Sequence, residues 1–214
     1  MLDWDHNAYY HRLLLRQLPQ PSRRVLDVGC GAGAFAARLA QRSERVDAVD
    51  RSPAMIEEAR RRTPHNVTCV LADVLADSLP AREYDAIFSI SALHHMPLPD
   101  ALAVLGAALR PGGILAAVVL PRTDVLREFP VEIVAAVGHR LLGALFRMKG
   151  LLGGGSWFAK DPAHASMPVV MDPPLTTREA ARQAAAVLPG ARVRRLLFWR
   201  YLLIWQKPIS PETR

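Results

Sequence analysis

Short hydrophobic runs alternate with longer amphipathic segments from residue 24 onward, and this rhythm is typical of a parallel β-sheet built from β–α–β units. The predicted strands span Val25–Val28, Arg45–Val49, Val67–Leu71, Tyr84–Ser89 and Ile114–Leu120. The segments between them that are long enough to be crossover helices are Gly33–Arg42, Pro53–Thr63 and Pro99–Leu109. We therefore predict an α/β fold.

Residues with special backbone preferences mark where two of these elements begin. Ser52 and Pro53 form a helix start, because serine caps the free amides of a first turn and proline suits its first helical position. The sequence Arg110-Pro111-Gly112-Gly113 is predicted to break the chain before the fifth strand.

The last forty residues continue the pattern with one more helix and two more strands. Thr176 and Glu179 have the spacing of a capping box, which predicts the start of an alanine-rich helix. The β-rich runs Val193–Phe198 and Tyr201–Ile204 follow, separated only by Trp199-Arg200, and they predict a closing hairpin.

We predict one domain over residues 1–214, with additions to the sheet at two places. Residues 1–22 are amphipathic and are expected to form an N-terminal helical cap. Residues 121–175 contain no strand of the earlier kind and are expected to be an insertion that covers the site as a lid. Within it, Val125–Lys149 is a possible helix and Gly150–Pro174 is loop-like.

Composition narrows the class of protein without identifying it. Half of the 214 residues are hydrophobic and 22% are charged, as in a globular domain, and the longest apolar runs are too short to span a bilayer. No secretory signal opens the sequence, and Cys30 and Cys69 alone cannot build a disulfide framework. These features predict a cytoplasmic protein.

The net charge of +7 is the feature that would favour nucleic acid as a partner. The cations are 24 arginines and only three lysines, a bias typical of GC-rich coding sequences. The charge is therefore weak evidence, and we expect no nucleic-acid partner.

The most informative segment is Asp27-Val28-Gly29-Cys30-Gly31-Ala32-Gly33. A buried strand leads directly into three glycines and then a helix. Glycine suits both a tight turn and the close approach of a ligand to the backbone, because it has no Cβ. Asp27 would orient this loop or bind an ammonium group. The motif predicts a nucleotide-type ligand, although nicotinamide, flavin and other sites use related loops.

Two further acidic residues follow strands that neighbour this loop. Asp50 ends the second predicted strand, where a carboxylate can accept both hydroxyls of a ribose. Asp73 follows the third strand and suits the exocyclic amine of adenine. In a doubly wound sheet the carboxyl ends of the strands meet at one edge, so we expect these residues to share one ligand.

These motifs together resemble the class I S-adenosylmethionine-dependent methyltransferases of the small-molecule type. The matching segments are Asp27–Gly33, Asp50, Ala72–Val74, Tyr84–Ser89, Ser91–His95 and Leu109–Gly113. The resemblance covers about residues 22–120 motif by motif and the C-terminal part only in outline. It implies a Rossmann-like sheet of seven strands in the order 3-2-1-4-5-7-6, with the last strand antiparallel.

The resemblance also implies S-adenosyl-L-methionine as the cofactor and S-adenosyl-L-homocysteine as its product. The residues that we assign to cofactor binding on this basis are Asp27, Gly29, Cys30, Gly31, Gly33, Asp50, Arg51, Met55, Ala72, Asp73, Val74, Ser89, Ile90, Ser91 and His94. A nicotinamide dinucleotide is the alternative, but it expects a third glycine where Ala34 stands and gives Asp73 no role.

Methyl transfer needs alignment above all, and a base only where the acceptor must first lose a proton. His94 and His95 follow the fourth strand and are the candidate catalytic residues, as a base or as acceptor-orienting groups. Packing alone is the competing interpretation. No cluster with metal-ligand spacing is present in the sequence, so we expect no metal.

The acceptor is predicted to be a small, mostly apolar metabolite that is methylated on O, N or possibly C. The candidate substrate-binding residues are His6, Tyr9, Tyr10, His11, Trp157 and Phe158. An RNA methyltransferase and a non-catalytic cofactor-binding protein remain alternative functions. Peripheral membrane contact through Val131–Leu152 is an alternative to the lid.

Overall fold

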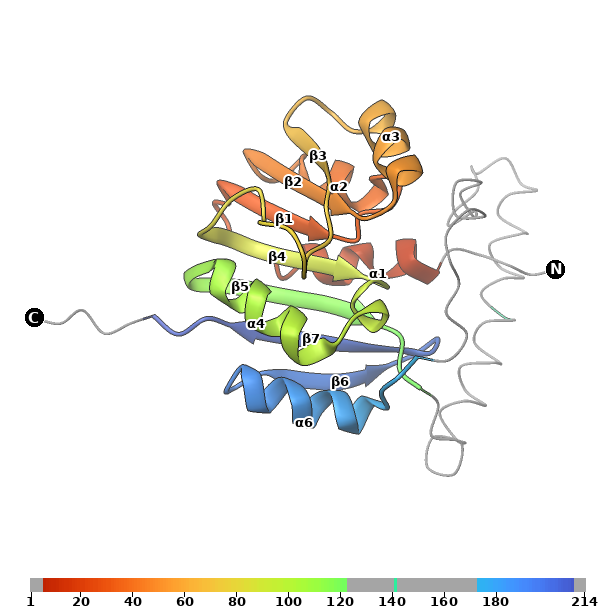
Figure 1. Ribbon diagram of the computed structural model, residues 1–214, viewed down its shortest axis with the longest axis vertical. Helices are drawn as coiled ribbons and strands as arrows, with labels where there is room; N and C mark the ends of the chain where they lie inside the picture. The colour runs from red at the N-terminus through yellow and green to blue at the C-terminus, as the bar shows by residue number, and fades with distance from the viewer. Residues whose placement is uncertain (1–5, 123–140, 142–172, 210–214) are drawn as a thin grey trace, which may run out of the picture.

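The computed structural model describes residues 6–122, 141 and 173–209, and a seven-stranded sheet runs through its centre (Figure 1). The strands are β1 (Arg24–Val28), β2 (Arg45–Asp50), β3 (Val67–Leu71), β4 (Tyr84–Ile90), β5 (Leu109–Val119), β6 (Arg192–Leu196) and β7 (Arg200–Gln206). The helices are α1 (His6–Leu15), α2 (Ala34–Leu39), α3 (Pro53–Arg62), α4 (Leu98–Ala108) and α6 (Thr177–Val187), with a 3-10 turn, η1, at Leu93–His95.

The strand order is β3-β2-β1-β4-β5-β7-β6, which confirms the expected topology. The pairings of β1 with β2 and β4, of β2 with β3 and of β4 with β5 are parallel, whereas β7 runs antiparallel to both β5 and β6. The carboxyl ends of β1 to β5 therefore meet the beginning of β7 at one edge of the sheet.

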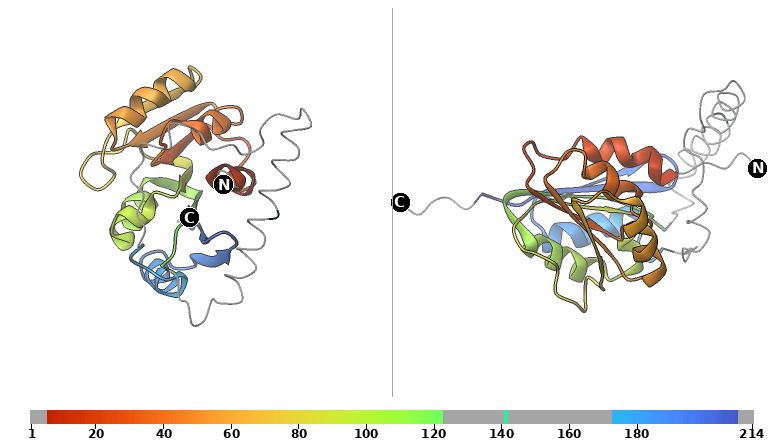
Figure 2. Two further views of the ribbon diagram at one scale, coloured as in Figure 1. Left: turned by 90° about the vertical axis from the view of Figure 1, so that its right-hand side faces the viewer. Right: turned by 90° about the horizontal axis from the view of Figure 1, so that it is seen from above.

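Helices cover both faces of the sheet, as buried parallel strands require. Figure 2 shows α1 and α4 on opposite faces. One core cluster joins α1, α2 and α3 to the sheet through residues such as Leu14, Leu39 and Ile56. The other joins α4 and α6 through Leu102 and Ala184. Buried apolar residues of these helices thus anchor them to the sheet on both sides of the site edge.

The predicted helix starts are confirmed. The Ser52 hydroxyl accepts a hydrogen bond from the Met55 amide at 3.4 Å, with Pro53 at the first helical position. Both hydrogen bonds of the capping box between Thr176 and Glu179 are present at the start of α6. α2 ends at Leu39, three residues before the predicted end at Arg42.

The predicted break at Arg110–Gly113 is wrong, because this segment belongs to β5. Tyr84 faces Leu109 whereas Ala86 faces Ile114, so the additional residues form an irregularity within the strand. Gly112 has a φ of 77°, and its amide donates to the Lys207 carbonyl at 2.8 Å, while the Lys207 amide donates to Gly113 at 2.9 Å. Pairing with the end of β7 thus keeps the irregular segment in the sheet.

The C-terminal hairpin is confirmed, with a turn one residue earlier than predicted. Phe198 and Trp199 both have a φ of 55°, so the chain reverses there and Arg200 becomes the first residue of β7. Phe198 is buried at 1% exposure in the cluster on the α1 face, which gives the strained turn an apolar anchor.

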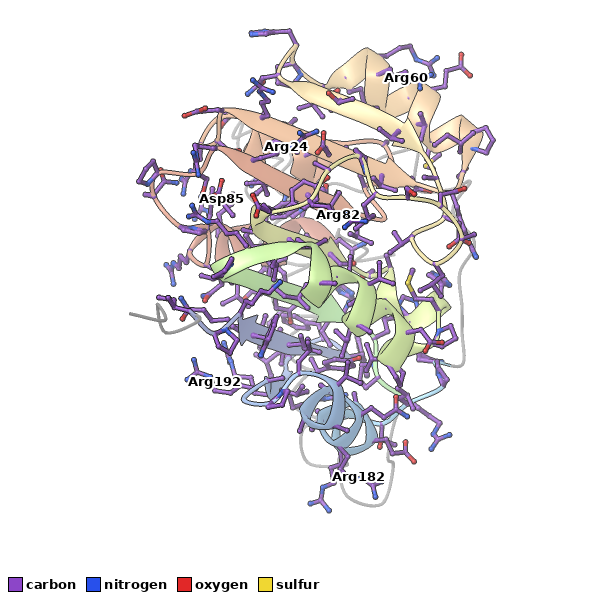
Figure 3. All side chains as sticks on the ribbon, turned by 60° about the vertical axis from the view of Figure 1, so that its left-hand side comes forward. Arg24, Arg60, Arg82, Asp85, Arg182 and Arg192 are labelled. Atoms are coloured by element: carbon purple, nitrogen blue, oxygen red, sulfur yellow. The ribbon has the colours of Figure 1, made fainter. Side chains whose placement is uncertain are left out.

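The opposite, amino edge of the sheet is tied together by two buried carboxylates. Asp47 accepts from Arg24 Nε at 2.8 Å and from the Tyr84 hydroxyl at 2.7 Å. Asp85 pairs with Arg110 Nε at 2.8 Å (Asp85 is labelled in Figure 3). These contacts link β1, β2, β4 and β5 at the end far from the glycine loop and fix their mutual register.

No helix in the described part of the chain is long and apolar enough to cross a membrane. The expected insertion over 121–175 lies outside the described residues except at 121–122, 141 and 173–175, and so do Trp157 and Phe158.

Candidate functional site

A cavity of about 650 Å³ opens at the carboxyl ends of β1, β2 and β4. It brings together most of the residues that the sequence singled out, from segments far apart in the chain. The predicted residues that line it are His6, His11, Asp27, Gly29, Cys30, Gly31, Asp50, Arg51, Met55, Ala72, Asp73, Val74, Ile90, Ser91, His94 and His95.

The glycine loop closes one wall of the cavity and depends on glycine for packing. Gly29 has a φ of 70°, and a Cβ there would lie 2.2 Å from the Cβ of Ala92. The amides of Gly29 and Cys30 both donate to the Val49 carbonyl, at 2.8 and 3.0 Å. The loop therefore lies pressed between the end of β2 and the segment that follows β4.

Asp50 connects this loop to the next turn of the site. One carboxylate oxygen accepts from the Gly31 amide at 2.9 Å, and the other accepts from the Ser52 amide at 2.9 Å. A carboxylate offers about four acceptor positions. Asp50 thus orders the glycine loop and keeps acceptor capacity for the two hydroxyls of a ribose.

Asp73 lies beyond Asp50 at the end of β3. The Ala72 amide donates to the Asp50 carbonyl at 3.1 Å, which anchors the segment to β2. Asp73 Oδ1 accepts from the Leu75 amide at 2.9 Å, and the Asp73 amide donates to Asp77 Oδ2 at 2.8 Å. This loop presents Asp73 beside the apolar Val74, a combination that suits an aromatic ring with a donor on its edge.

Asp27 is the most unusual carboxylate of the site. It is 2% exposed, and no hydrogen-bond partner for its Oδ2 atom exists among the described residues. Burial, with a smaller contribution from the negative charge of Asp50, raises the pKa of Asp27 from 3.8 to about 7. A buried oxygen without a donor marks a position where a ligand cation would compensate the charge.

His94 and His95 stand next to each other on η1, with ring centroids 4.1 Å apart. Burial, with smaller contributions from His95 and the cation of Arg200, lowers the pKa of His94 to about 3. Burial and Arg51 also lower the pKa of His95. His94 is therefore a neutral imidazole at physiological pH, and its Nδ1 atom is buried with no partner in the described chain.

The polar residues of the cavity wall that sequence reasoning did not assign to the site include Asn7 and Arg200. Asn7 Oδ1 accepts from the Ser91 hydroxyl at 2.7 Å and from Arg200 Nη2 at 3.3 Å. The network joins α1, the end of β4 and the start of β7. Asn7 stood beside His6 in a segment already expected to cover the site, whereas Arg200 was assigned to a turn and carried no local signal.

Four predicted site residues within the described ranges do not line the cavity. Gly33 caps α2 and packs against α3, where an added Cβ would lie 2.6 Å from Thr63 Cγ2. The hydroxyl of fully buried Ser89 donates to the Val28 carbonyl at 2.9 Å, which ties β4 to β1. Tyr10 donates to the Leu197 carbonyl and Tyr9 packs edge-on against Phe198, so both rings hold α1 against the hairpin.

Among the described residues, no group of three or more His, Cys, Asp or Glu side chains is arranged to hold a metal ion. Cys30 and Cys69 are free, buried thiols. Burial raises the pKa of Cys30, with Asp27 adding to the effect, so the Cys30 thiol is not a reactive thiolate.

Comparison with known proteins identifies relatives over the whole chain. A family model described as a methyltransferase domain matches residues 25–113. A protein named an uncharacterized methyltransferase from Mycobacterium tuberculosis is 36% identical over 208 residues, covering 96% of this chain and 98% of the relative. A ubiquinone biosynthesis O-methyltransferase from Methylocella silvestris is 36% identical over 127 residues, covering 56% of this chain and 49% of the relative.

The fold has solved counterparts as well. The N-methyltransferase NodS from Bradyrhizobium japonicum, determined with S-adenosyl-L-homocysteine, superposes with a TM-score of 0.62. The two chains are 18% identical over 97% of this chain and 90% of NodS, so this likeness concerns the fold.

Proposed function

Because the chain belongs to the class I S-adenosylmethionine-dependent methyltransferases, we propose that it transfers the methyl group to an oxygen or nitrogen of a small molecule bound in the cavity at the ends of β4 and β7. The observation that carries this proposal is the convergence of the glycine loop, three aspartates and a neutral histidine on one cavity. The methyl donor is S-adenosylmethionine, which supplies an activated methyl carbon on a sulfonium centre.

The order of the strands distributes the parts of the cofactor along the edge. Asp73 and Val74 at β3 would hold the adenine, and Asp50 at β2 would bind the ribose hydroxyls. Asp27, with its unpartnered Oδ2, would bind the ammonium group of the methionine part.

On the acceptor side the protein's contribution is alignment, because the carbon is already activated. The pKa of about 3 makes His94 a weak base at neutral pH. We therefore favour an orienting role for His94, whose ring nitrogens would hold the acceptor in line with the methyl carbon. His6 and His11 face the same cavity from α1 and would complete its wall.

Calorimetric titration with S-adenosylmethionine tests the proposal. We expect one site per chain and a loss of affinity of about tenfold or more in Asp50→Asn, since a charged hydrogen-bond partner is lost. His94→Ala should keep cofactor affinity and lose turnover, whereas equal, small effects of His94→Ala and His95→Ala on turnover would contradict a role at the reacting atoms.

The remaining expectations stay part of this proposal. The predictions of a mostly apolar acceptor and of a lid over 121–175 are based on apolar residues such as Trp157 and Phe158. A cytoplasmic location is supported by the free thiols of Cys30 and Cys69.

The alternative of an RNA substrate finds little support at the arginine run of α3. Arg61 pairs with Glu57 and Glu58, and Arg60 donates to the Cys69 carbonyl at 3.2 Å. The arginines of this run are thus engaged in surface ion pairs and a backbone hydrogen bond at the C-terminal end of α3, whereas the cavity lies at the N-terminal end of this helix.

A further inference from the structure

Arg200 lines the cavity from the start of β7. It is the first residue of β7, and because β7 is antiparallel, this first residue lies at the same edge as the last residues of β4 and β5. Ser91 and His94 line the same cavity from the segment after β4. Of the residues proposed above for the cofactor, Asp50 and Asp73 lie on the other side of the glycine loop, at the ends of β2 and β3, and Asp27 lies in β1 directly before the loop.

The guanidinium of Arg200 is held in place by the backbone and by α1. Nη1 donates to the carbonyl of Trp199 at 3.1 Å, and Nη2 donates to Asn7 Oδ1 at 3.3 Å. Arg200 is half-buried; its charge opposes the rise that burial causes in the pKa of Tyr10 and contributes to the lowered pKa of His94. A fixed positive charge of this kind attracts an oxyanion and gives it an orientation.

We propose that Arg200 binds the carboxylate of the methyl acceptor, so that this methyltransferase forms methyl esters of small carboxylic acids. The inference rests on the proposed function and adds the chemical class of the acceptor. Burial, with smaller contributions from His95 and Arg200, keeps His94 neutral, and a neutral His94 does not compete with Arg200 for the carboxylate charge.

The reaction balances without a proton acceptor. A lone pair of the carboxylate oxygen forms the new bond to the methyl carbon while the bond from carbon to sulfur breaks. The bonding pair remains on sulfur, which becomes a neutral thioether, and the acceptor becomes a neutral ester. No proton moves, because a carboxylic acid is ionised well below neutral pH.

Other acceptor classes fit this environment less well. A phenol or an alcohol must lose a proton to become a strong nucleophile, and His94, with a pKa of about 3, is a poor base for that step. An amine that enters as an ammonium ion would be repelled by Arg200. A carboxylate is attracted by the cation and is already ionised.

The chemical test uses the stability of the product. The full chain is incubated with S-adenosylmethionine labelled in its methyl group and with probe sets that share one ring or chain each, for example benzoate, phenol, benzyl alcohol and benzylamine. Aliphatic mono- and dicarboxylates with their matching alcohols, and a small-molecule filtrate of bacterial cells, extend the range. Methyl esters release volatile labelled methanol in mild alkali, whereas methyl ethers and methylamines do not.

Three variants test whether the Arg200 side chain is responsible for binding the carboxylate. In Arg200→Gln we expect the KM for the carboxylate to rise about 10- to 100-fold with unchanged affinity for S-adenosylmethionine, since a charged hydrogen-bond donor is lost. Arg200→Lys keeps the positive charge but loses the planar guanidinium, so its KM for the carboxylate should lie between those of the wild type and Arg200→Gln. Arg192→Gln, which changes an exposed arginine at the amino edge, is the matched control. Thermal unfolding confirms that each variant is folded.

A binding measurement gives a result even when no probe is turned over. The protein saturated with S-adenosylhomocysteine is titrated with each carboxylate and its matching alcohol, and we expect a preference for the carboxylate that Arg200→Gln removes. Alkali-stable methylated product, or no preference for any carboxylate, would overturn the inference and leave the proposed function intact. Failure to bind S-adenosylmethionine would instead overturn the proposed function itself.

Discussion

The side chain of Asn7 accepts a hydrogen bond from the hydroxyl of Ser91, 84 residues later in the chain, at 2.7 Å. Ser91 has a φ of 53°, an unusual conformation for serine, and its amide donates to the Val118 carbonyl at 2.8 Å. The contact therefore joins α1 to the strained residue that directly follows β4. Through it the N-terminal helix takes part in the wall of the cofactor site.

The first prediction concerns this contact. Asn7→Ala removes the acceptor shared by Ser91 and Arg200, so we expect α1 to open more often and the Kd for S-adenosylmethionine to rise about 3- to 10-fold. Hydrogen exchange of the α1 amides should become faster, while the global unfolding temperature changes little. Arg12→Ala, on an exposed position of the same helix, is the control; an equal effect of both variants would contradict the prediction.

The second prediction concerns the pH dependence of stability. The pKa of Asp27 is about 7 in the folded chain, against an ordinary value of 3.8. The contribution of Asp27 to the free energy of unfolding is therefore fully present below about pH 4 and is lost as the pH rises through about 7. Asp27→Asn should therefore be more stable than the wild type at about pH 8, by up to about 4 kcal/mol, and the gain should shrink toward about pH 5. Chemical denaturation of the ligand-free protein measures this.

The same variant should lose function while it gains stability. An ammonium ion needs ionised Asp27, so the wild-type affinity for S-adenosylmethionine should fall as the pH drops below about 7, and Asp27→Asn should bind at least about tenfold more weakly. Asp100→Asn, at an exposed position of α4, should change neither property. A pH-independent affinity in the wild type would show that Asp27 does not bind the cation.

The third prediction separates two reasons for glycine in the loop. Gly29→Ala adds a Cβ that meets Ala92 at 2.2 Å and also occupies a positive φ, so we expect a loss of about 2–4 kcal/mol in the free energy of unfolding. Gly190 has a φ of 87°, and an added Cβ there would have no atom within 4 Å. Gly190→Ala should therefore lower the free energy of unfolding by only about 1–2 kcal/mol.

A double variant tests the steric part directly. Gly29→Ala combined with Ala92→Gly removes the opposing methyl group, and we expect it to recover about 1–2 kcal/mol relative to Gly29→Ala. If the loss in the double variant equals the sum of the losses in the two single variants, the glycine loop must change conformation to accept the new Cβ, and Ala92 does not restrict it. Urea denaturation of the four proteins supplies the comparison.

The fourth prediction concerns His94. Since its pKa is about 3, turnover should show no titration of this group between about pH 6 and pH 8. His94→Gln, which keeps a polar group, should retain more turnover than His94→Ala, and both should bind S-adenosylmethionine as the wild type does. His65→Gln changes an exposed histidine remote from the cavity and serves as the control. A rise of turnover with a pKa near 6.5 that His94→Gln abolishes would instead establish His94 as a base.

The order of the elements and the cofactor side of the site were readable from the sequence. Asp50 and Asp73 each come directly after a hydrophobic run, and parallel strands bring all their carboxyl ends to one edge. Ser89 shows where such local reasoning ends. Because Ser89 lies near the end of β4, the sequence predicted that it contacts the cofactor. Side chains alternate along a strand, however, and the Ser89 hydroxyl donates to the Val28 carbonyl instead.

The sequence by itself thus determined the α/β class, the glycine loop and the family, because those features depend on residues that are neighbours in the chain. Only the tertiary structure decided the acceptor side. Arg200 reaches the cavity because β7 inserts antiparallel between β5 and β6, and Asn7 reaches it because α1 packs across the sheet from the other end of the chain. Such contacts are set by the pairing of distant strands and by side-chain packing, which no local pattern of residues records.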